Sequence, residues 1–290
     1  LANVVGMELK AIWIDKGSAT PDAHATAVAM LEKLMPLLLS FLSHEYDEVS
    51  SSVFTAIGEI LAVFKKVQRE GVPLSASQQG FLSRLMPILV DKLKYGEDYP
   101  WPTASDASIG DNDGSLDEGD EEVMFGEMRR NLRVFIDAIA QIAPALYDGT
   151  MLATAQAIFK QCSQYGVSAE QAGDGGDNGR GQLGWVRAEL GLYLTQAYGE
   201  RLSSNKALRF SGPKHGQSNG VQSSGASASG PSIESLSDLL TMMIQSGVAA
   251  CRHPAIAPMF FENCVRFNGY FDVRREAATP VLTSFLSATG

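Results

Sequence analysis

A short proline-bearing motif constrains the fold of this chain more than any other feature of its sequence. The motif LMPLLLSFL at residues 34–42 returns as LMPILVDKL at residues 85–93, and a third copy reads TPVLTSFL at residues 279–286. A proline inside a helix removes one backbone hydrogen bond and crowds the preceding turn. The repeat in one register therefore predicts the same bent helix at three places in the fold.

The rest of the chain also follows a helical pattern. Apolar residues recur with the spacing of a helix face wherever the sequence is not rich in Gly or Asp, and no segment alternates as a strand does. Glycines, prolines and capping residues divide the sequence into expected helices near residues 1–15, 22–43, 47–69, 76–95, 121–142, 145–165, 182–200, 233–248, 254–270 and 274–288.

A tight turn and a second apolar helix follow the first copy of the motif. Asp47 in this turn is available as the N-cap of the second helix. A hairpin of this kind has an apolar face that it cannot bury alone, so successive hairpins are expected to stack. The proline-bearing helix and the Asp-containing turn resemble the HEAT repeat, although Ser50 stands where that repeat usually has Arg. The expected fold is therefore all-α, a HEAT-repeat α-solenoid of antiparallel helix hairpins.

One continuous array is expected over residues 1–290, with an acidic loop at 96–123, a Gly-rich loop at 166–181 and a Gly/Ser-rich loop at 203–231. Ten of the 33 acidic residues lie in 96–123, which contains no Lys or Arg. The other 23 acids equal the 23 bases, so this loop accounts for the net charge of -10. Thirteen of the 21 residues at 211–231 are Gly, Ser or Pro. We expect disorder there, because such a segment buries too little apolar surface.

The sequence also disfavours several classes of protein. Three cysteines without the paired spacing of a zinc site favour a reducing compartment. No signal-peptide pattern opens the sequence and no apolar run approaches the length of a membrane span, so neither secretion nor membrane insertion is expected. Because the sequence starts at Leu1 and stops inside an apolar helical pattern, we expect it to be a piece of a longer chain.

The acidic loop has a partial calcium-binding pattern. Asp111, Asp113, Ser115 and Glu122 occupy positions 1, 3, 5 and 12 of an EF-hand loop. Leu116, however, stands where the sharp turn of that loop needs Gly, and no apolar helix precedes it. An acidic loop that repels or mimics an anionic partner is the favoured interpretation, and no metal site is expected.

No catalytic constellation or cofactor motif emerges from the sequence. The stretch GRGQLG at residues 179–184 matches a dinucleotide fingerprint, but the required strand does not precede it. Cys251 beside His253, with Cys264 nearby, is the strongest nucleophile arrangement; it fits an interhelical turn better, with Cys264 as a small core residue. We expect no enzyme activity, no catalytic residue and no cofactor.

Basic residues gather on the expected second helices of the hairpins. In a solenoid these helices line one surface, so the cations on them could form a stripe that follows a phosphate backbone. The alternative is an ordinary solvated helix face. The basic groups are Lys65, Lys66 and Arg69, then Arg129, Arg130 and Arg133, with a further group of Arg252, Arg266, Arg274 and Arg275.

Three stretches carry a family resemblance: residues 37–53, residues 92–99 together with 120–132, and residues 239–248 continuing through 260–271. In order and spacing they resemble the central HEAT-repeat region of the tRNA exportin family (exportin-t) of the importin-β, or karyopherin, superfamily. The expanded acidic and Gly/Ser-rich loops are similar to fungal members. We expect the amino-terminal repeats, which hold most of the Ran-binding surface in this superfamily, and the carboxy-terminal arch to lie outside this sequence.

The resemblance implies a nuclear export receptor that does no chemistry. It implies a monomeric carrier that binds tRNA cooperatively with the Ran GTPase in its GTP form, passes the nucleoporins of the nuclear pore, and shuttles between nucleus and cytoplasm. Charge and position in the sequence, and not the resemblance, predict the tRNA-binding residues Lys65, Lys66, Arg69, Arg129, Arg130 and Arg133. The predicted contacts to Ran or another partner are Asp117, Glu118, Asp120, Glu121 and Glu122. The alternative is another HEAT-repeat karyopherin or scaffold with a protein cargo.

Overall fold

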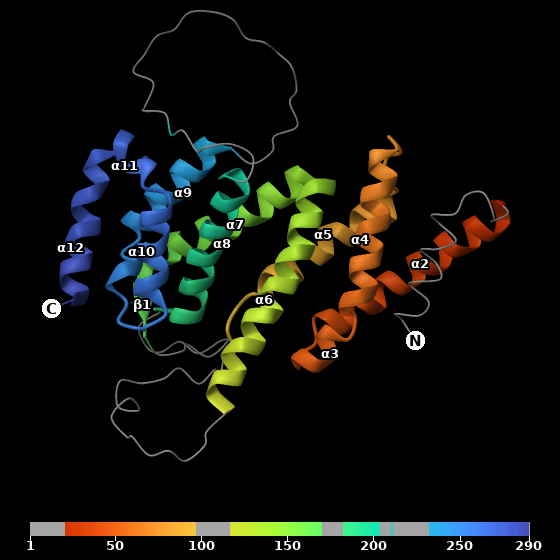
Figure 1. The fold of residues 1–290 in the computed structure, drawn as a ribbon, viewed down its shortest axis with the longest axis horizontal. Coiled ribbons are helices and arrows are strands. Elements are labelled where there is room, and N and C mark those ends of the chain that lie inside the picture. The colour runs from red at the N-terminus through yellow and green to blue at the C-terminus, as the bar shows by residue number, and fades with distance from the viewer. Residues whose placement is uncertain (1–20, 97–116, 170–181, 204–209, 211–231, 290) are drawn as a thin grey trace, which may run out of the picture. The chain divides into compact units, whose positions relative to one another are not determined.

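The computed structural model of this chain describes residues 21–96, 117–169, 182–203, 210 and 232–289 (Figure 1). The chain forms two compact units, residues 1–147 and residues 148–290. Helices dominate both, which confirms the predicted all-α class. The helix expected at 1–15 and the disorder expected at 211–231 lie outside the described residues. The prediction of one continuous array over the whole chain stays a prediction.

The first unit contains two helical hairpins in its described residues. The first hairpin pairs α2 (Pro21–Leu42) with α4 (Phe54–Arg69), and the single turn α3 (Asp47–Ser51) lies between them. The second hairpin pairs α5 (Ala76–Asp91) with α6 (Asp117–Ile142). A capping box starts α5: Ser75 Oγ accepts a hydrogen bond from the Gln78 amide, and the Gln78 side chain accepts one from the Ser75 amide.

The two hairpins stack helix by equivalent helix. The first helices α2 and α5 pack together, and so do the second helices α4 and α6. The ring of Phe54 meets the ring of Phe135 edge-on, with centroids 5.4 Å apart, and near the other end of α4 the Gln68 side chain donates to the Ile142 carbonyl at 2.6 Å. The helices α4 and α6 therefore run in the same direction, as expected for stacked HEAT hairpins.

The repeated prolines have two different positions in helices. Pro36 lies inside α2 and Pro87 inside α5, as predicted. Both are exposed, while the preceding Met35 and Met86 are buried in the core. Pro280, in contrast, is the third residue of α12 (Ala278–Thr289). In the first helical turn no intrahelical N–H is needed, so the prediction of a third bent helix is wrong.

The expected helix over 47–69 is interrupted, because α3 ends at Ser51 and α4 begins at Phe54. Asp47 is the first residue of α3 and not its N-cap; the N-cap position is taken by Tyr46, without a side-chain cap. Asp47 instead forms an ion pair with Lys92, whose Nζ lies 3.4 Å from Oδ1 and also donates to the Glu45 carbonyl at 3.3 Å. This contact joins the turn of the first hairpin to the end of α5.

The second unit is built around α8 (Trp185–Ser203), which packs on α9 (Ile233–Gln245) and α10 (Ile256–Arg266). The helix α7 (Pro144–Tyr165) precedes these helices, and α11 (Gly269–Val273) lies between α10 and α12. The described residues of this unit also form two short 3₁₀ turns, Val248–Ala250 and Arg275–Ala277.

Glycines on α8 allow its neighbours to come close: a Cβ at Gly191 would lie 2.8 Å from the Ile158 side chain. A Cβ at Gly199 would overlap the ring of Phe267.

A two-residue parallel ladder joins β1 (Val167–Ser168) to β2 (Leu183–Gly184). The sequence predicted no strand, so this pairing is a correction. It brings together the two ends of the Gly-rich segment whose central residues, 170–181, lie outside the described part of the chain. The ladder depends on a contact between residues far apart in sequence. A strand of two residues is too short to show the alternating pattern by which a strand is predicted.

A buried tyrosine connects three helices of the second unit. The Tyr198 hydroxyl on α8 donates to Asp148 Oδ1 of α7 at 2.6 Å and accepts the backbone N–H of Ser232 at 3.1 Å. Ser232 is the N-cap of α9, and its Oγ accepts the Ser235 amide at 3.0 Å. The starts of α7 and α9 are thus both tied to one side chain of α8.

One segment of α2, Ala25–Leu42, is long and apolar enough to cross a membrane, judged by length and composition alone. This differs from the expectation that no stretch of the sequence reaches that length. Leu31, Met35, Leu38 and Leu42 on this helix are buried in the first unit. Because helices of folded units meet the same test, the segment does not by itself indicate membrane insertion.

Candidate nucleic-acid interface

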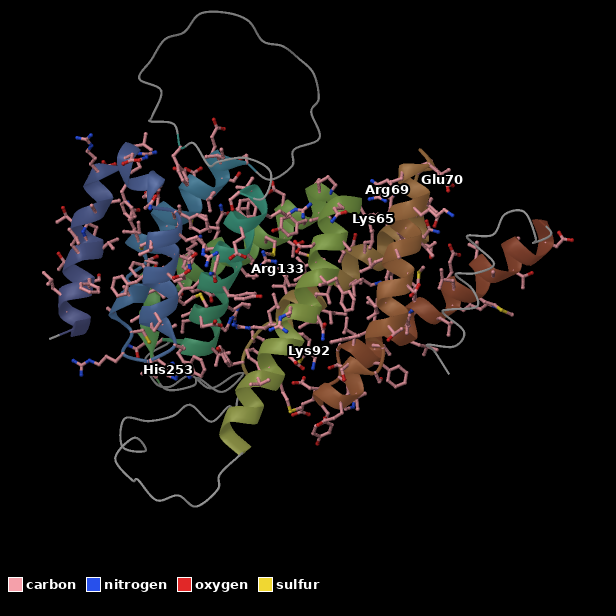
Figure 2. The ribbon with its side chains drawn as sticks, viewed as in Figure 1. Lys65, Arg69, Glu70, Lys92, Arg133 and His253 are labelled. Atoms are coloured by element: carbon pink, nitrogen blue, oxygen red, sulfur yellow. The ribbon has the colours of Figure 1, made fainter. Side chains whose placement is uncertain are left out.

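Three of the predicted RNA-contacting residues lie in the last two turns of α4: Lys65, Lys66 and Arg69, here called the α4 cluster. Arg69 is exposed and the two lysines are half-buried. Figure 2 shows Lys65 and Arg69 together at this end of the helix, with Glu70 directly after them. Cations at a helix carboxy terminus are favoured by the helix dipole. The α4 cluster is therefore a stable concentration of positive charge on a second helix.

The predicted arginines of α6 lie in different surroundings. Arg130 is exposed. Arg133 is half-buried, and its Nε lies 3.7 Å from Asp137 Oδ2 one turn further along α6. The ion pair offsets part of the Arg133 charge, so Arg130 carries the more accessible positive charge of these two residues.

Arg129 is only 7% exposed. Its Nε donates to the Leu93 carbonyl at 2.8 Å. Its guanidinium carbon lies 4.6 Å from the ring centres of both Tyr95 and Phe125. A guanidinium packed in this way offers little surface to a phosphate, so the predicted RNA contact of Arg129 has no support in its geometry. Sequence reasoning missed the two aromatic residues, although Tyr95 immediately precedes the acidic stretch and Phe125 follows it by two residues.

The acidic residues predicted to contact Ran or another partner lie at the other end of α6. The helix begins at Asp117 and not near 121, so the last part of the expected acidic loop is helical. Acidic residues in a first helical turn are favoured by the helix dipole, which explains the earlier start. The residues concerned are Asp117, Glu118, Asp120, Glu121 and Glu122.

The two charged regions lie at opposite ends of one helix pair. Because α4 and α6 run in parallel and Gln68 contacts Ile142, the α4 cluster lies beside the carboxy end of α6. At 1.5 Å per residue, Phe125 is about 25 Å along the helix from Ile142. Figure 1 shows the first turns of α6 at the end of this helix remote from the carboxy end of α4. The α4 cluster and the acidic turns of α6 therefore lie at opposite ends of this helix pair.

Two of the four arginines in the basic group near the carboxy terminus are paired with carboxylates. Arg266 makes ion pairs with Glu200 at 2.5 Å and with Glu262 at 2.6 Å. Arg274 lies 3.9 Å from Glu276. These pairs lower the local positive charge, so this group is a weaker candidate for phosphate contact than the α4 cluster.

The remaining motifs of the sequence do not assemble a chemical site in the described residues. Asp111, Asp113 and Ser115 of the calcium pattern and residues 179–181 of the glycine motif lie outside the described part, while Glu122 is in α6 and Gly184 in β2. In the part of the chain that the structure describes, no group of three or more His, Cys, Asp or Glu side chains could hold a metal ion. His44 is exposed, and its Nδ1 accepts the Tyr46 amide.

The cysteines are buried thiols, and their surroundings oppose ionisation. Burial raises the pKa of Cys162 and of Cys264 to about 12, and it also raises the pKa of Cys251. His253 stacks on Trp185 with ring centroids 3.7 Å apart and an interplanar angle of 6°. Burial lowers the pKa of His253, which disfavours an imidazolium that could stabilise a thiolate. The Cys251 and His253 pair therefore lacks the electropositive setting of a nucleophilic cysteine.

These pKa shifts predict slow thiol chemistry in the native protein. A thiol with a pKa of about 12 is roughly 0.01% thiolate at pH 8, and the thiolate is the reactive form. Ellman's reagent should therefore label the three cysteines much more slowly than a free cysteine, and at the free rate once the protein is denatured. Rapid labelling of the native protein would show that a thiol is activated.

A model of the Exportin-T family matches residues 21–289, from α2 to α12 and across both units. The chain belongs to the Exportin-T family. This confirms the resemblance seen in the sequence, and the match extends over all the helices that the structure describes.

Fungal Exportin-T proteins align with the whole chain or nearly all of it. Exportin-T of Mycosarcoma maydis is 29% identical over 300 residues, which cover 100% of this chain and 26% of the relative. Exportin-T of Laccaria bicolor is 28% identical, and the alignment covers 100% of this chain and 25% of the relative. Exportin-T of Emericella nidulans is 23% identical, and the alignment covers 94% of this chain and 23% of the relative. The chain spans about a quarter of the length of the Exportin-T relatives it matches.

Proposed function

We propose that this chain is part of a nuclear export receptor that carries tRNA to the cytoplasm and binds it together with Ran in its GTP form. The observation that carries the proposal is the Exportin-T family match over residues 21–289. Stacked helical hairpins support it, because they present long surfaces suited to wrapping a macromolecule. The receptor acts by binding, without a cofactor or a catalytic residue, as a monomer that passes the nucleoporins and shuttles between nucleus and cytoplasm.

Cooperation between the two ligands follows from linkage. If tRNA and Ran-GTP favour the same curvature of the receptor, each raises the affinity for the other by the same factor. Loss of Ran-GTP in the cytoplasm then weakens tRNA binding and releases the cargo. Ran itself hydrolyses GTP, so the receptor needs no reactive group.

Within the first unit, the proposed phosphate contacts are the α4 cluster, Arg130 and the partly paired Arg133. All five lie on the second helices α4 and α6, and Arg69 and Arg130 are exposed while the others are half-buried, which supports this assignment. Phosphate contacts supply affinity that does not depend on sequence, as a carrier of many tRNAs requires. The acidic amino-terminal turns of α6 are the proposed contact for Ran or another basic surface.

The proposal is tested by binding of labelled tRNA to the complete protein that contains this chain. The measurement is made at one fixed salt concentration with Ran-GTP, with Ran-GDP and without Ran. Tight binding with Ran-GTP alone is the expected result. Equal tRNA binding in all three conditions, or no binding in any of them, would contradict the proposal. Either result would favour the alternative of a HEAT-repeat scaffold with a protein cargo.

A further inference from the structure

Two aromatic residues bracket the acidic segment and touch each other in space. Tyr95 stands just before this segment, and Phe125 follows its last carboxylate. Their ring centroids are 4.4 Å apart with an interplanar angle of 32°. The contact therefore holds the end of the α5 turn against the first turns of α6, at the base of the segment that joins them.

Arg129 completes this contact. Its guanidinium carbon is 4.6 Å from the centre of each ring, and its Nε–H is bonded to the Leu93 carbonyl. Cation–π attraction is strongest when the cation is removed from water, as it is at this buried position. The planar group can stack on rings while its Nε donates, which the ammonium of a lysine cannot reproduce.

We propose that Arg129 is a positioning residue: with Tyr95, Phe125 and the Leu93 carbonyl it forms a clasp that fixes the acidic first turns of α6. The clasp keeps these turns at one end of the α4 and α6 pair, away from the α4 cluster. Its effect on RNA rests on the proposed function, since the phosphates of a bound nucleic acid are then directed to the α4 cluster.

The distance between the acidic turns of α6 and the α4 cluster determines how strongly the two groups of charges interact. The helix from Phe125 to Ile142 is about 25 Å long, and the Debye length at physiological salt is about 8 Å. Over three Debye lengths the carboxylates barely reduce the attraction of the α4 cluster for phosphate. If the first turns of α6 unwound, six residues at 117–122 alone could extend by about 20 Å. The carboxylates could then come within screening range of the cluster.

The first experiment measures the clasp without any RNA. Arg129→Lys keeps the charge but loses the planar stacking, and Arg130→Lys is the matched control at the exposed neighbouring position. Amide exchange over residues 117–128 should become roughly tenfold faster in Arg129→Lys and stay unchanged in the control. Exchange over residues 132–142 should not change in either variant. Unchanged exchange over 117–128 in Arg129→Lys would overturn the clasp.

Two further variants separate stacking from general destabilisation. Tyr95→Leu removes the ring and should reproduce the faster exchange, whereas Tyr95→Phe keeps the ring and should restore the behaviour of the unaltered protein. Faster exchange in Tyr95→Phe equal to that in Tyr95→Leu would show that ring stacking is not what holds the segment.

The second experiment measures the effect on a polyanion. With the complete protein and Ran-GTP, Arg129→Lys should weaken tRNA binding several-fold at low salt, and the difference should vanish at high salt. Changing residues 117, 118, 120, 121 and 122 to their amides should abolish the effect of Arg129→Lys. Equal binding at every salt concentration would overturn the charge-separating role. If the unaltered protein fails to bind tRNA, the proposed function fails, while amide exchange and the salt needed to elute each variant from heparin still test the clasp.

Discussion

Reversing the charge of Lys65 and Arg69 together is expected to weaken tRNA binding by at least about tenfold at physiological salt. Both residues lie at the carboxy end of α4, where a bound phosphate would meet them with Lys66. If each cation neutralises one phosphate, the slope of log affinity against log salt should fall by roughly two. The measurement is a salt titration of tRNA binding to the complete protein in the presence of Ran-GTP.

The control is a double variant with the same change of charge in the second unit, Lys160→Glu with Arg187→Glu. Both of these residues are exposed, on α7 and α8 respectively. This control should leave the salt slope unchanged and lower affinity by a much smaller factor. Equal losses in the two double variants would mean that net charge governs binding and that the α4 cluster is not a local phosphate site.

Gly199→Ala is expected to destabilise the protein by about 1–3 kcal/mol, through overpacking. The added methyl group would occupy the space of the Phe267 ring, where α8 meets the end of α10. The free energy of unfolding, measured by denaturant titration, checks this. Combining Gly199→Ala with Phe267→Leu should recover part of the loss, because the smaller side chain makes room for the methyl group.

A second glycine provides the control for helix propensity. Gly149 lies in α7, and a methyl group added to its Cα would meet no other atom within 4 Å. Gly149→Ala should therefore leave stability unchanged or raise it by up to about 1 kcal/mol. Equal effects at Gly149 and Gly199 would show that backbone propensity, and not contact with Phe267, controls the response.

Local signals in the sequence were enough to predict most helices. The repeated proline motif predicted α2 and α5, because the motif and its apolar spacing lie within one helix and need no distant partner. The third copy misled because a proline in the first turn of α12 and one inside a helix look alike in sequence. The ladder of β1 and β2 was missed for the opposite reason: it exists through pairing alone.

The candidate site was predictable in its charge and much less in its geometry. The clustering of cations in the sequence pointed to α4 and α6 as the helices of the candidate site. In the structure the α4 cluster lies at the carboxy end of its helix. The burial of Arg129 could not be predicted, because its carbonyl partner Leu93 is 36 residues away. For the same reason the pairing of Arg266 with Glu200, 66 residues apart, was hidden. Charge is a property of composition, whereas accessibility is decided by neighbours that folding brings together.

The hydrogen bonds of Tyr198 couple the packing of α8 to the points at which α7 and α9 start. One phenol hydroxyl binds Asp148 and the amide of Ser232, so the point at which α9 starts is set by α8 and α7. Loss of this one hydroxyl, as in Tyr198→Phe, would therefore loosen the starts of two helices at once, and neither of them is the helix that carries the tyrosine.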